Sequence, residues 1–273
     1  MGGSLSVTLN QRFSFPMAIV TLLTDSGESD HYVAAIKAKI LSTNSGIKII
    51  DISHQIQPCD IGHAAFVLRS VFREFPKGTT HLVGIHSTGQ RGDALIAVQL
   101  EDHFFVGVDN GLFGLISEKS HQNLVELNTI NAVLSTFPEK DILAPIAAKL
   151  ASGIALADLG IPMASFKKMI DRQVKATKKQ IAGHVIRVDN FGNLITNIPK
   201  DAFDVLSKTK TFTIQFGGEK FRRIHTQYNQ AEEGECFLLF NSLGLLEIGI
   251  YKGHASELLG LTYGSMVNII FDE

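Results

Sequence analysis

The fold is decided by the stretch "MAIVTLLTDSGESDHYVAAIKAKILSTNSGIKIIDI", residues 17–52. It opens with a continuous apolar run at 17–23, which is typical of a strand buried on both faces of a parallel sheet. Apolar residues at helical spacing follow at 31–43, and we expect Ser29 or Asp30 to cap that helix. The closing run "IKIIDI" predicts a second buried strand. A strand, a helix and a strand in this order predict a βαβ unit.

The same pattern then repeats, which favours a layered α/β domain with a mostly parallel sheet. A helix is predicted over 60–75 and a strand over 81–85. Apolar runs at 95–100 and 103–108 are separated by only two residues and predict a hairpin. A further helix is expected at 141–152.

The composition changes at 165–180, where lysines are frequent and large apolar side chains are few. Beyond this segment the chain consists of short apolar runs separated by Gly, Asn and Glu turns, which predicts antiparallel strands. We therefore expect a flexible lead (1–16), an α/β domain (17–165), a linker (166–180) and a small antiparallel β-barrel domain (181–273).

Charge and cysteine content narrow the class of protein. The net charge is -2 and no run of Lys or Arg stands out, so we expect no nucleic-acid partner. No apolar run approaches the roughly 18 residues that span a bilayer, and the N-terminus lacks the pattern of a signal peptide. The two cysteines, Cys59 and Cys236, suit a reducing compartment. We expect a cytoplasmic protein without a membrane partner.

Two polar clusters follow the first two predicted strands. Asp25 and Asp30 lie where ligands bind in open α/β sheets, beyond the carboxyl ends of the strands. They could accept from ribose hydroxyls or from an ammonium group, or serve only as turn and helix cap. Asp51, His54 and Asp60 form the second cluster. A metal site is conceivable there, but a helix cap at Asp60 and a hydrogen-bonded loop histidine are the preferred interpretation.

Two further clusters lie in the C-terminal part. "VDNFGNLITN" places the aromatic Phe191 between Asp189 and Asn193, a combination suited either to holding a heteroaromatic base or to a plain hairpin turn. "FNSLGLLEIGI" adds Ser242 at a strand end and Glu247 in the next strand. The chain contains no GxxxxGK[ST], GxGxxG or GxSxG motif, which argues against P-loop, dinucleotide-binding and α/β-hydrolase chemistry.

Taken in order, the clusters resemble the S-adenosylmethionine hydroxide adenosyltransferase family, which is related to the SAM-dependent fluorinase and chlorinase. The motifs that carry the resemblance include "TLLTDSGESDHYVAAIKAKI", "IIDISHQIQPCDIGHAAFVL", "FFVGVDNGLFG", "DILAPIAAKLASG", "VDNFGNLITNI" and "NSLGLLEIGIYKGHASELLGL". The resemblance covers about 17–273. It implies an α/β domain, a β-barrel domain and a homotrimer in which SAM lies between neighbouring subunits.

The resemblance also implies roles for individual residues. Asp25 corresponds to the residue that holds the ribose hydroxyls. Asp30 and Asp189 correspond to residues near the methionine amino group, and Asn193 to a contact with adenine or the ligand backbone. The remaining ligand-binding positions are Ser242 at the methionine end, with Glu247 and Ile250 in the strand that borders the adenine.

The implied reaction is displacement at the ribose C5′ by water or hydroxide, which yields adenosine and L-methionine. Because the sulfonium is already an activated leaving group, the protein needs only to orient it, to position the nucleophile in line and to remove a proton. We expect no metal and no cofactor.

The chain departs from the family at the residues that activate water. The family pattern "VDPGVGTxRRxIAV" corresponds to "IHSTGQRGDALIAV" at 85–98, so His86 replaces an Asp, and Asp93 and Ala94 replace an Arg pair. The pattern "FHGRD" corresponds to "FPEKD", so Pro138 replaces a His.

These departures leave three hypotheses. A rewired site could use His86 as the base, since imidazole has an unperturbed pKa near 6.5, with Arg91 nearby in sequence. A halide nucleophile is disfavoured, because the carboxylate of Glu139 would repel an anion. Alternatively the protein binds SAM or adenosine without catalysis, as a sensor or a vestigial module. A SAM-hydrolysing enzyme is the preferred interpretation.

Overall fold

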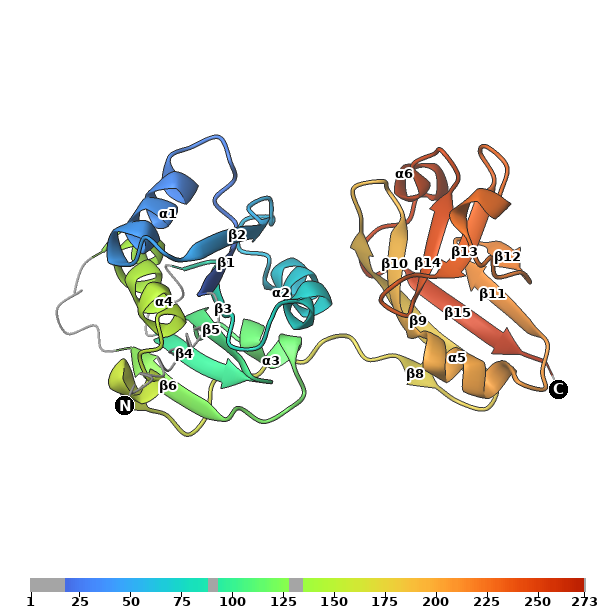
Figure 1. Cartoon of the computed structure of the whole chain (residues 1–273). Coiled ribbons are helices and arrows are strands. Elements are labelled where there is room, and N and C mark those ends of the chain that lie inside the picture. The colour runs from blue at the N-terminus through green and yellow to red at the C-terminus, as the bar shows by residue number, and fades with distance from the viewer. Residues whose placement is uncertain (1–17, 88–92, 128–134, 273) are drawn as a thin grey trace, which may run out of the picture. The chain divides into compact units, whose positions relative to one another are not determined.

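The computed structural model describes residues 18–87, 93–127 and 135–272 of the chain. The chain divides between Ile170 and Asp171 into two compact units, which are drawn in Figure 1 and are described here one at a time. The described part contains no helix that is both long enough and apolar enough to cross a membrane.

The N-terminal unit, within the described ranges, is built on one seven-stranded sheet in the order β2-β1-β3-β5-β4-β6-β7. Parallel pairing joins β2 to β1, β1 to β3 and β3 to β5, which confirms the predicted parallel arrangement in that half of the sheet. The other half is antiparallel, because the chain turns back from β4 into β5 through a hairpin, β4 also pairs with β6, and β6 pairs with β7. The strands are β1 Ile19–Thr24, β2 Lys48–Ser53, β3 Thr80–Gly84, β4 Leu95–Leu100, β5 His103–Val108, β6 Asn123–Leu127 and β7 Gly160–Pro162.

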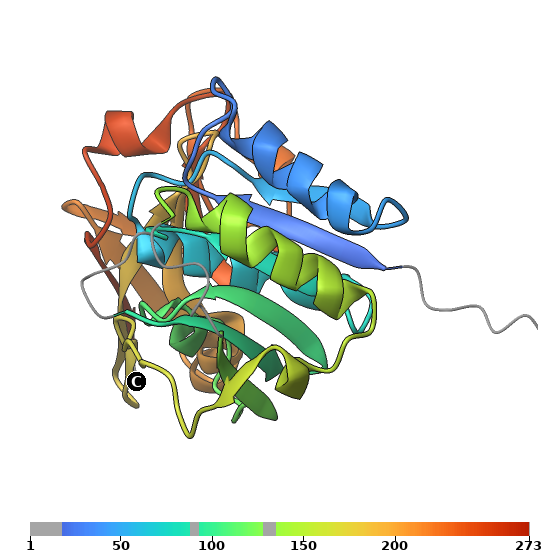
Figure 2. The ribbon, with the colours of Figure 1, turned by 90° about the vertical axis from the view of Figure 1, so that its left-hand side faces the viewer.

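Helices cover both faces of this sheet. On one face, α1 (Tyr32–Thr43) lies beside α4 (Ala144–Ala151), which continues from the π-helical turn η2 (Glu139–Leu143) (Figure 2). On the other face lie α2 (Ile61–Val71) and α3 (Leu112–Ile116) (Figure 1). Short 3-10 turns, η1 (Phe72–Glu74) and η3 (Leu156–Asp158), complete the described helical segments of this unit.

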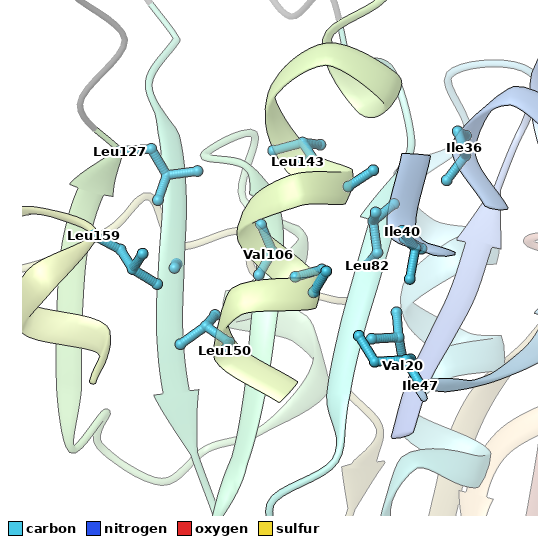
Figure 3. Close-up of a cluster of buried hydrophobic side chains, with 14 of the residues drawn as sticks. Val20, Ile36, Ile40, Ile47, Leu82, Val106, Leu127, Leu143, Leu150 and Leu159 are labelled. Atoms are coloured by element: carbon cyan, nitrogen blue, oxygen red, sulfur yellow. The ribbon is translucent and has the colours of Figure 1, made fainter. Parts of the chain in front are cut away.

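Successive side chains along a strand point to opposite faces of the sheet, so each inner strand contributes to the core on both faces. Leu82 of β3 packs with Ile36 of α1 and Leu143 of η2 (Figure 3), whereas the next residue, Val83, packs into the cluster formed with α2 and α3. Strands buried on both faces read as continuous apolar runs in sequence. β2 lies at the edge and is only half-buried, so the prediction of a fully buried second strand is wrong.

The hairpin between β4 and β5 and the start of α1 test two predictions made from short stretches of sequence. Glu101 and Asp102 both have left-handed backbones (φ 50° and 65°), as a two-residue hairpin of the predicted kind requires. The predicted cap of α1 is wrong. The helix begins at Tyr32, its N-cap is His31 without a side-chain hydrogen bond, and Asp30 therefore lies one residue too early to cap it.

The C-terminal unit forms an antiparallel sheet, ordered β12-β11-β15-β9-β10-β14-β13 with β8 added to β9. The sheet curls around an apolar core that includes Ile181, Leu238 and Ile269. This confirms the predicted fold class, an α/β domain followed by an antiparallel barrel-like one. The elements are β8 Lys175–Ala176, β9 Gln180–Val188, β10 Leu194–Pro199, α5 Lys200–Ser207, β11 Phe212–Phe216, β12 Glu219–Phe221, η4 Tyr228–Gln230, β13 Cys236–Phe240, β14 Leu245–Ile250, α6 Ala255–Leu259 and β15 Met266–Phe271.

Candidate functional site

Asp25 lies directly after β1, at the carboxyl ends of three adjacent parallel strands. Its Oδ2 accepts from the backbone N–H of Cys59 at 2.9 Å and from that of His86 at 3.1 Å. Its own backbone N–H donates to the carbonyl of Gly84 at 3.2 Å. One carboxylate thus joins the segments that follow β1, β2 and β3, at the edge where ligands bind in open α/β sheets.

Both residues that donate to Asp25 have unusual backbones. Cys59 has φ 63° and His86 has φ 48°, although neither is glycine. A left-handed backbone costs an L-residue about 1–2 kcal/mol, and such residues gather at active sites and ligand clamps. Both strained residues thus lie at the sheet edge where ligands bind in open α/β folds.

Glu139 approaches the same edge from η2. A methyl group placed on Gly84 would lie 2.9 Å from Cγ of Glu139 and 3.2 Å from Cγ2 of Thr24, so the glycine leaves the space that the Glu139 side chain occupies. Burial raises the pKa of the Glu139 carboxyl, and the charge of Asp25 adds to the rise, whereas the backbone amide of Glu139 and the nearby Ser87 hydroxyl oppose it. We call Asp25, Cys59, His86, Ser87 and Glu139 the strand-end cluster.

A second row of polar residues supports the loop that carries Asp25. The Thr24 hydroxyl lies 2.8 Å from Nδ1 of His54, and Nε2 of His54 lies 3.1 Å from Asp51. Burial alone would raise the pKa of Asp51, but the hydrogen bond from Lys37 and the nearby ring of His54 lower it overall. His54 is therefore a hydrogen-bonded loop histidine, which was the preferred interpretation of the sequence.

The hypothetical metal site is not formed by these residues. Oδ1 of Asp60 accepts from the backbone N–H of His63 at 2.9 Å and caps α2, which confirms the predicted cap. Within the described ranges, no group of three or more His, Cys, Asp or Glu side chains is arranged to hold a metal ion.

The remaining expected residues of the N-terminal unit lie elsewhere or outside the described ranges. Asp30 is exposed in the loop before α1. The carboxylate of Asp93 forms an ion pair with Lys167, whose backbone N–H donates to Asp109 at 2.8 Å. Asp93 thus forms an ion pair at the position that the resemblance aligns with an Arg. Arg91 lies outside the described residues.

The C-terminal unit contains a pocket of about 630 Å³, which we call the aromatic pocket. Three of the expected ligand-binding residues, Asp189, Asn193 and Ile250, line it together. The other lining residues are Phe191, Tyr228, Phe237, Tyr251, Lys252, Gly253 and His254.

A tight turn builds one wall of the aromatic pocket. Oδ1 of Asp189 accepts from the backbone N–H groups of Phe191 and Asn193, both at 2.9 Å. Gly192 has φ 81°, and a side chain there would lie 2.4 Å from the ring of His254. The turn leaves the ring of Phe191 74% exposed beside the pocket. The segment is therefore a hairpin turn that also presents an aromatic face.

Glu247 lies behind this wall and is 3% exposed. Its carboxylate accepts from the side-chain amides of Asn193 at 3.1 Å and Asn241 at 3.0 Å. Burial raises the pKa of Glu247, and the charge of Asp189 adds to the rise. Because a carboxylate only accepts, the amide nitrogen of Asn193 must face Glu247, which leaves its oxygen toward Gly249. Glu247 positions Asn193 and does not line the pocket itself.

One residue expected to bind the ligand lies outside the pocket lining, and one lining residue was not predicted from the sequence. Ser242 lies exposed in the turn between β13 and β14, outside the pocket lining. Tyr228 was not singled out in the sequence, yet it lines the pocket and packs edge-on against Phe237, with ring centroids 5.3 Å apart. Burial and the nearby Glu247 raise the pKa of Tyr228 to about 12, so its phenol stays protonated.

Comparison with protein families defines the class to which this architecture belongs. Residues 20–160 match the SAM hydroxide adenosyltransferase N-terminal domain, and residues 183–268 match the C-terminal domain of the same family. The chain belongs to the SAM hydroxide adenosyltransferase family.

The similarity to individual relatives covers almost the whole chain. An (R)-S-adenosyl-L-methionine hydrolase of Methanocaldococcus jannaschii is 33% identical over 265 residues, which cover 93% of this chain and 96% of the relative. A protein of the same name from Thermus thermophilus is 29% identical over 93% of this chain and all of its own length. A fluorinase of Actinoplanes sp. is 23% identical over 66% of this chain and 71% of its own.

Solved structures show the same fold. An uncharacterized conserved protein of Thermotoga maritima superimposes with a TM-score of 0.84 at 30% identity, covering 92% of this chain and 99% of its own. A conserved hypothetical protein of Thermus thermophilus gives a TM-score of 0.73 at 28% identity over the same shares.

Proposed function

We propose that the protein hydrolyses S-adenosyl-L-methionine to adenosine and L-methionine. The observation that carries the proposal is the match, over 93% of the chain, to relatives named (R)-S-adenosyl-L-methionine hydrolase. Their name specifies the configuration at the sulfonium, so the (R) epimer is the proposed preferred substrate. The water oxygen bonds to C5′, the C5′–S bond breaks with its electron pair passing to sulfur, and the protein takes up one proton.

In this proposal the strand-end cluster holds the ribose. Both backbone donors reach Oδ2 of Asp25, and we assign Oδ1 to the ribose hydroxyls. A carboxylate has lone pairs enough to accept from vicinal hydroxyls and the backbone at once. Asp30 is assigned to the methionine amino group together with Asp189.

The aromatic pocket is assigned to the adenine end of the ligand. Phe191 offers a stacking face, Asn193 offers an amide oxygen and Ile250 an apolar border. Glu247 acts through Asn193, and Ser242 is assigned to the methionine end. With a sulfonium leaving group no metal or cofactor is needed, so turnover should persist in a chelator.

The proposed assembly is a homotrimer in which sites form between neighbouring subunits. Sedimentation equilibrium should then give three times the 29.8 kDa mass of one chain. A monomer that turns over SAM would overturn the trimer and leave the reaction in place.

The reaction is tested by incubating purified protein with each sulfonium epimer and measuring adenosine and methionine by chromatography. We expect equal amounts of both products, faster from the (R) epimer. Binding of SAM or adenosine by calorimetry without product, even at high enzyme concentration, would overturn hydrolysis and favour the binding-only alternative. The rates of His86→Ala and Arg91→Ala test whether His86 acts as a catalytic group and whether Arg91 assists it.

A further inference from the structure

In the alignment that the resemblance implies, the family's water-activating residues are replaced by His86, Asp93, Ala94 and Pro138. Pro138 carries no group that accepts a proton, and Asp93 is bound in an ion pair with Lys167. Hydrolysis at C5′ still requires a group that takes the proton of the attacking water. If the proposed function holds, another side chain at this edge has to supply that group.

The other carboxylates around this edge are already committed. Asp25 accepts two backbone N–H groups through Oδ2 and stands where the ribose is proposed to bind. Asp109 accepts from the backbone N–H of Lys167 at 2.8 Å. Neither is placed to act as a base without giving up a bond that shapes the site.

Glu139 differs from these carboxylates in its position. It opens η2, a π-helical turn closed by the bond from the Ala144 N–H to the Glu139 carbonyl. Such wide turns occur often at functional sites. The turn brings Cγ of Glu139 within 2.9 Å of a methyl group placed on Gly84, the last residue of β3, which precedes His86 by two residues.

We propose, resting on the proposed function, that Glu139 is the general base that removes the proton from the water attacking C5′. One carboxylate then holds the ribose and a second lies beside it at the ends of β1 and β3. The water oxygen forms its bond to C5′, the proton passes to an oxygen of Glu139, and methionine leaves with the electron pair of the C5′–S bond.

The surroundings of Glu139 suit this role. Burial and the negative charge of Asp25 raise the pKa of its carboxyl above the usual value, and a base is most effective when its pKa approaches the working pH. The buried Ser87 hydroxyl lies beside it. Among the described residues, the charged or titratable groups next to this position in the chain are His86, two residues after Gly84, and the Lys140–Asp141 ion pair that follows Glu139 on η2.

The test compares Glu139→Gln with wild type, using the (R) and (S) epimers at saturating concentration. We expect kcat to fall by about 10²–10⁴-fold, the usual contribution of a general base. Calorimetric affinity for adenosine should change less than about threefold, because Asp25 and the aromatic pocket are untouched. The acid limb of the wild-type pH profile should be absent from the residual activity of this variant.

Further variants keep the test decisive if Glu139→Gln folds poorly. Glu139→Asp should recover part of the rate, and formate should restore turnover to Glu139→Gly by supplying a carboxylate in solution. Glu118→Gln, an exposed glutamate of the same unit, is the matched control and should keep wild-type kcat.

The outcomes separate the two proposals. Wild-type turnover that survives in Glu139→Gln overturns this inference alone, and loss of turnover in His86→Ala would then assign the base to His86. Absence of product from wild type with both epimers overturns the proposed function and this inference together.

Discussion

The strand-end cluster and the aromatic pocket are built by opposite means. In the first, backbone N–H groups from two strained residues converge on the carboxylate of Asp25. In the second, a hairpin turn presents an exposed ring, and the buried Glu247 fixes the amide of Asn193. The replaced water-activating positions that the resemblance implies lie in the N-terminal unit, whereas the predicted Asp189 and Asn193 line one pocket in the other.

In the proposed assignments, the chemistry and the ribose belong to the strand-end cluster, whereas the adenine belongs to the aromatic pocket of the other unit. The turn and the buried carboxylate that hold the aromatic pocket both belong to the C-terminal unit. We therefore expect substitutions in the strand-end cluster to change the reaction more than they change the affinity of the aromatic pocket for adenosine. The predictions below probe that separation, beginning with the largest effect.

Asp25→Ala should give the largest loss. It removes the proposed acceptor of the ribose hydroxyls and leaves the N–H groups of Cys59 and His86 without their acceptor. Hydrogen bonds to charged groups contribute about 1.5–3 kcal/mol each, so kcat/KM should fall by roughly 10²–10⁴-fold. Steady-state kinetics checks this. Asp102→Asn, in the exposed hairpin, is the control, and an Asp25→Ala enzyme within threefold of wild type would contradict the assignment.

Gly249→Ala should damage the aromatic pocket and the fold together. A methyl group there would lie 2.0 Å from Cζ of Phe237 and 2.5 Å from Oδ1 of Asn193. Overpacking of this kind costs about 1–3 kcal/mol, measured as the free energy of unfolding in urea. The matched control is Gly62→Ala in α2, where the new methyl group has ordinary contacts and should stabilise the helix by about 0.5–1 kcal/mol. Equal stability of Gly249→Ala and wild type would argue against the packing described.

Phe191→Ala should weaken binding without affecting stability. The ring is 74% exposed, so little packing is lost, whereas stacking of one base on an aromatic ring contributes about 1–3 kcal/mol. The adenosine Kd should rise roughly tenfold with kcat unchanged. Leu258→Ala, also largely exposed, serves as control. A change in kcat alone would break the proposed separation of recognition from chemistry.

The smallest effect concerns acid stability, which has to be distinguished from the acid limb of activity. A hydrogen bond from Arg73 is the main cause that lowers the pKa of Glu101 to about 2, against a usual 4.5. A lowered folded-state pKa stabilises the fold above pH 4.5, and this contribution is lost as pH falls toward 2. Glu101→Gln should therefore shift the urea midpoint less between pH 6 and pH 3 than wild type does. An unchanged shift would remove Glu101 from the acid response.

The sequence predicted those parts of the fold that depend on local periodicity. The apolar runs of β1 and β3 and the hairpin at Glu101 and Asp102 follow from patterns within a few residues. The burial of β2 could not be predicted, because an apolar run does not reveal that its strand lies at the edge of the sheet. The buried hydrogen bond between Oγ1 of Thr21 and Nδ1 of His81, 2.7 Å long, could not be predicted either, because it joins strands that are distant in sequence.

The candidate site was predictable only in part for a related reason. Asp25 follows a strand directly in sequence, and Asp189 and Asn193 flank one turn, so each could be anticipated at a strand end of its own unit. Tyr228 reaches the aromatic pocket from η4, a segment without a recognisable pattern. Glu139 reaches the strand-end cluster only because a π-helical turn forms there, which no local motif indicates.

The strained Cys59 gives the protein a built-in attachment point for an optical reporter. Its thiol is exposed, and its backbone N–H binds the carboxylate proposed to hold the ribose. The other cysteine, Cys236, is half-buried, and burial raises the pKa of its thiol to about 12, which keeps it unreactive at neutral pH. A thiol-reactive fluorophore should therefore label the native chain at one position, beside Asp25. Ligand arrival could then be followed by fluorescence in real time, without first removing a cysteine.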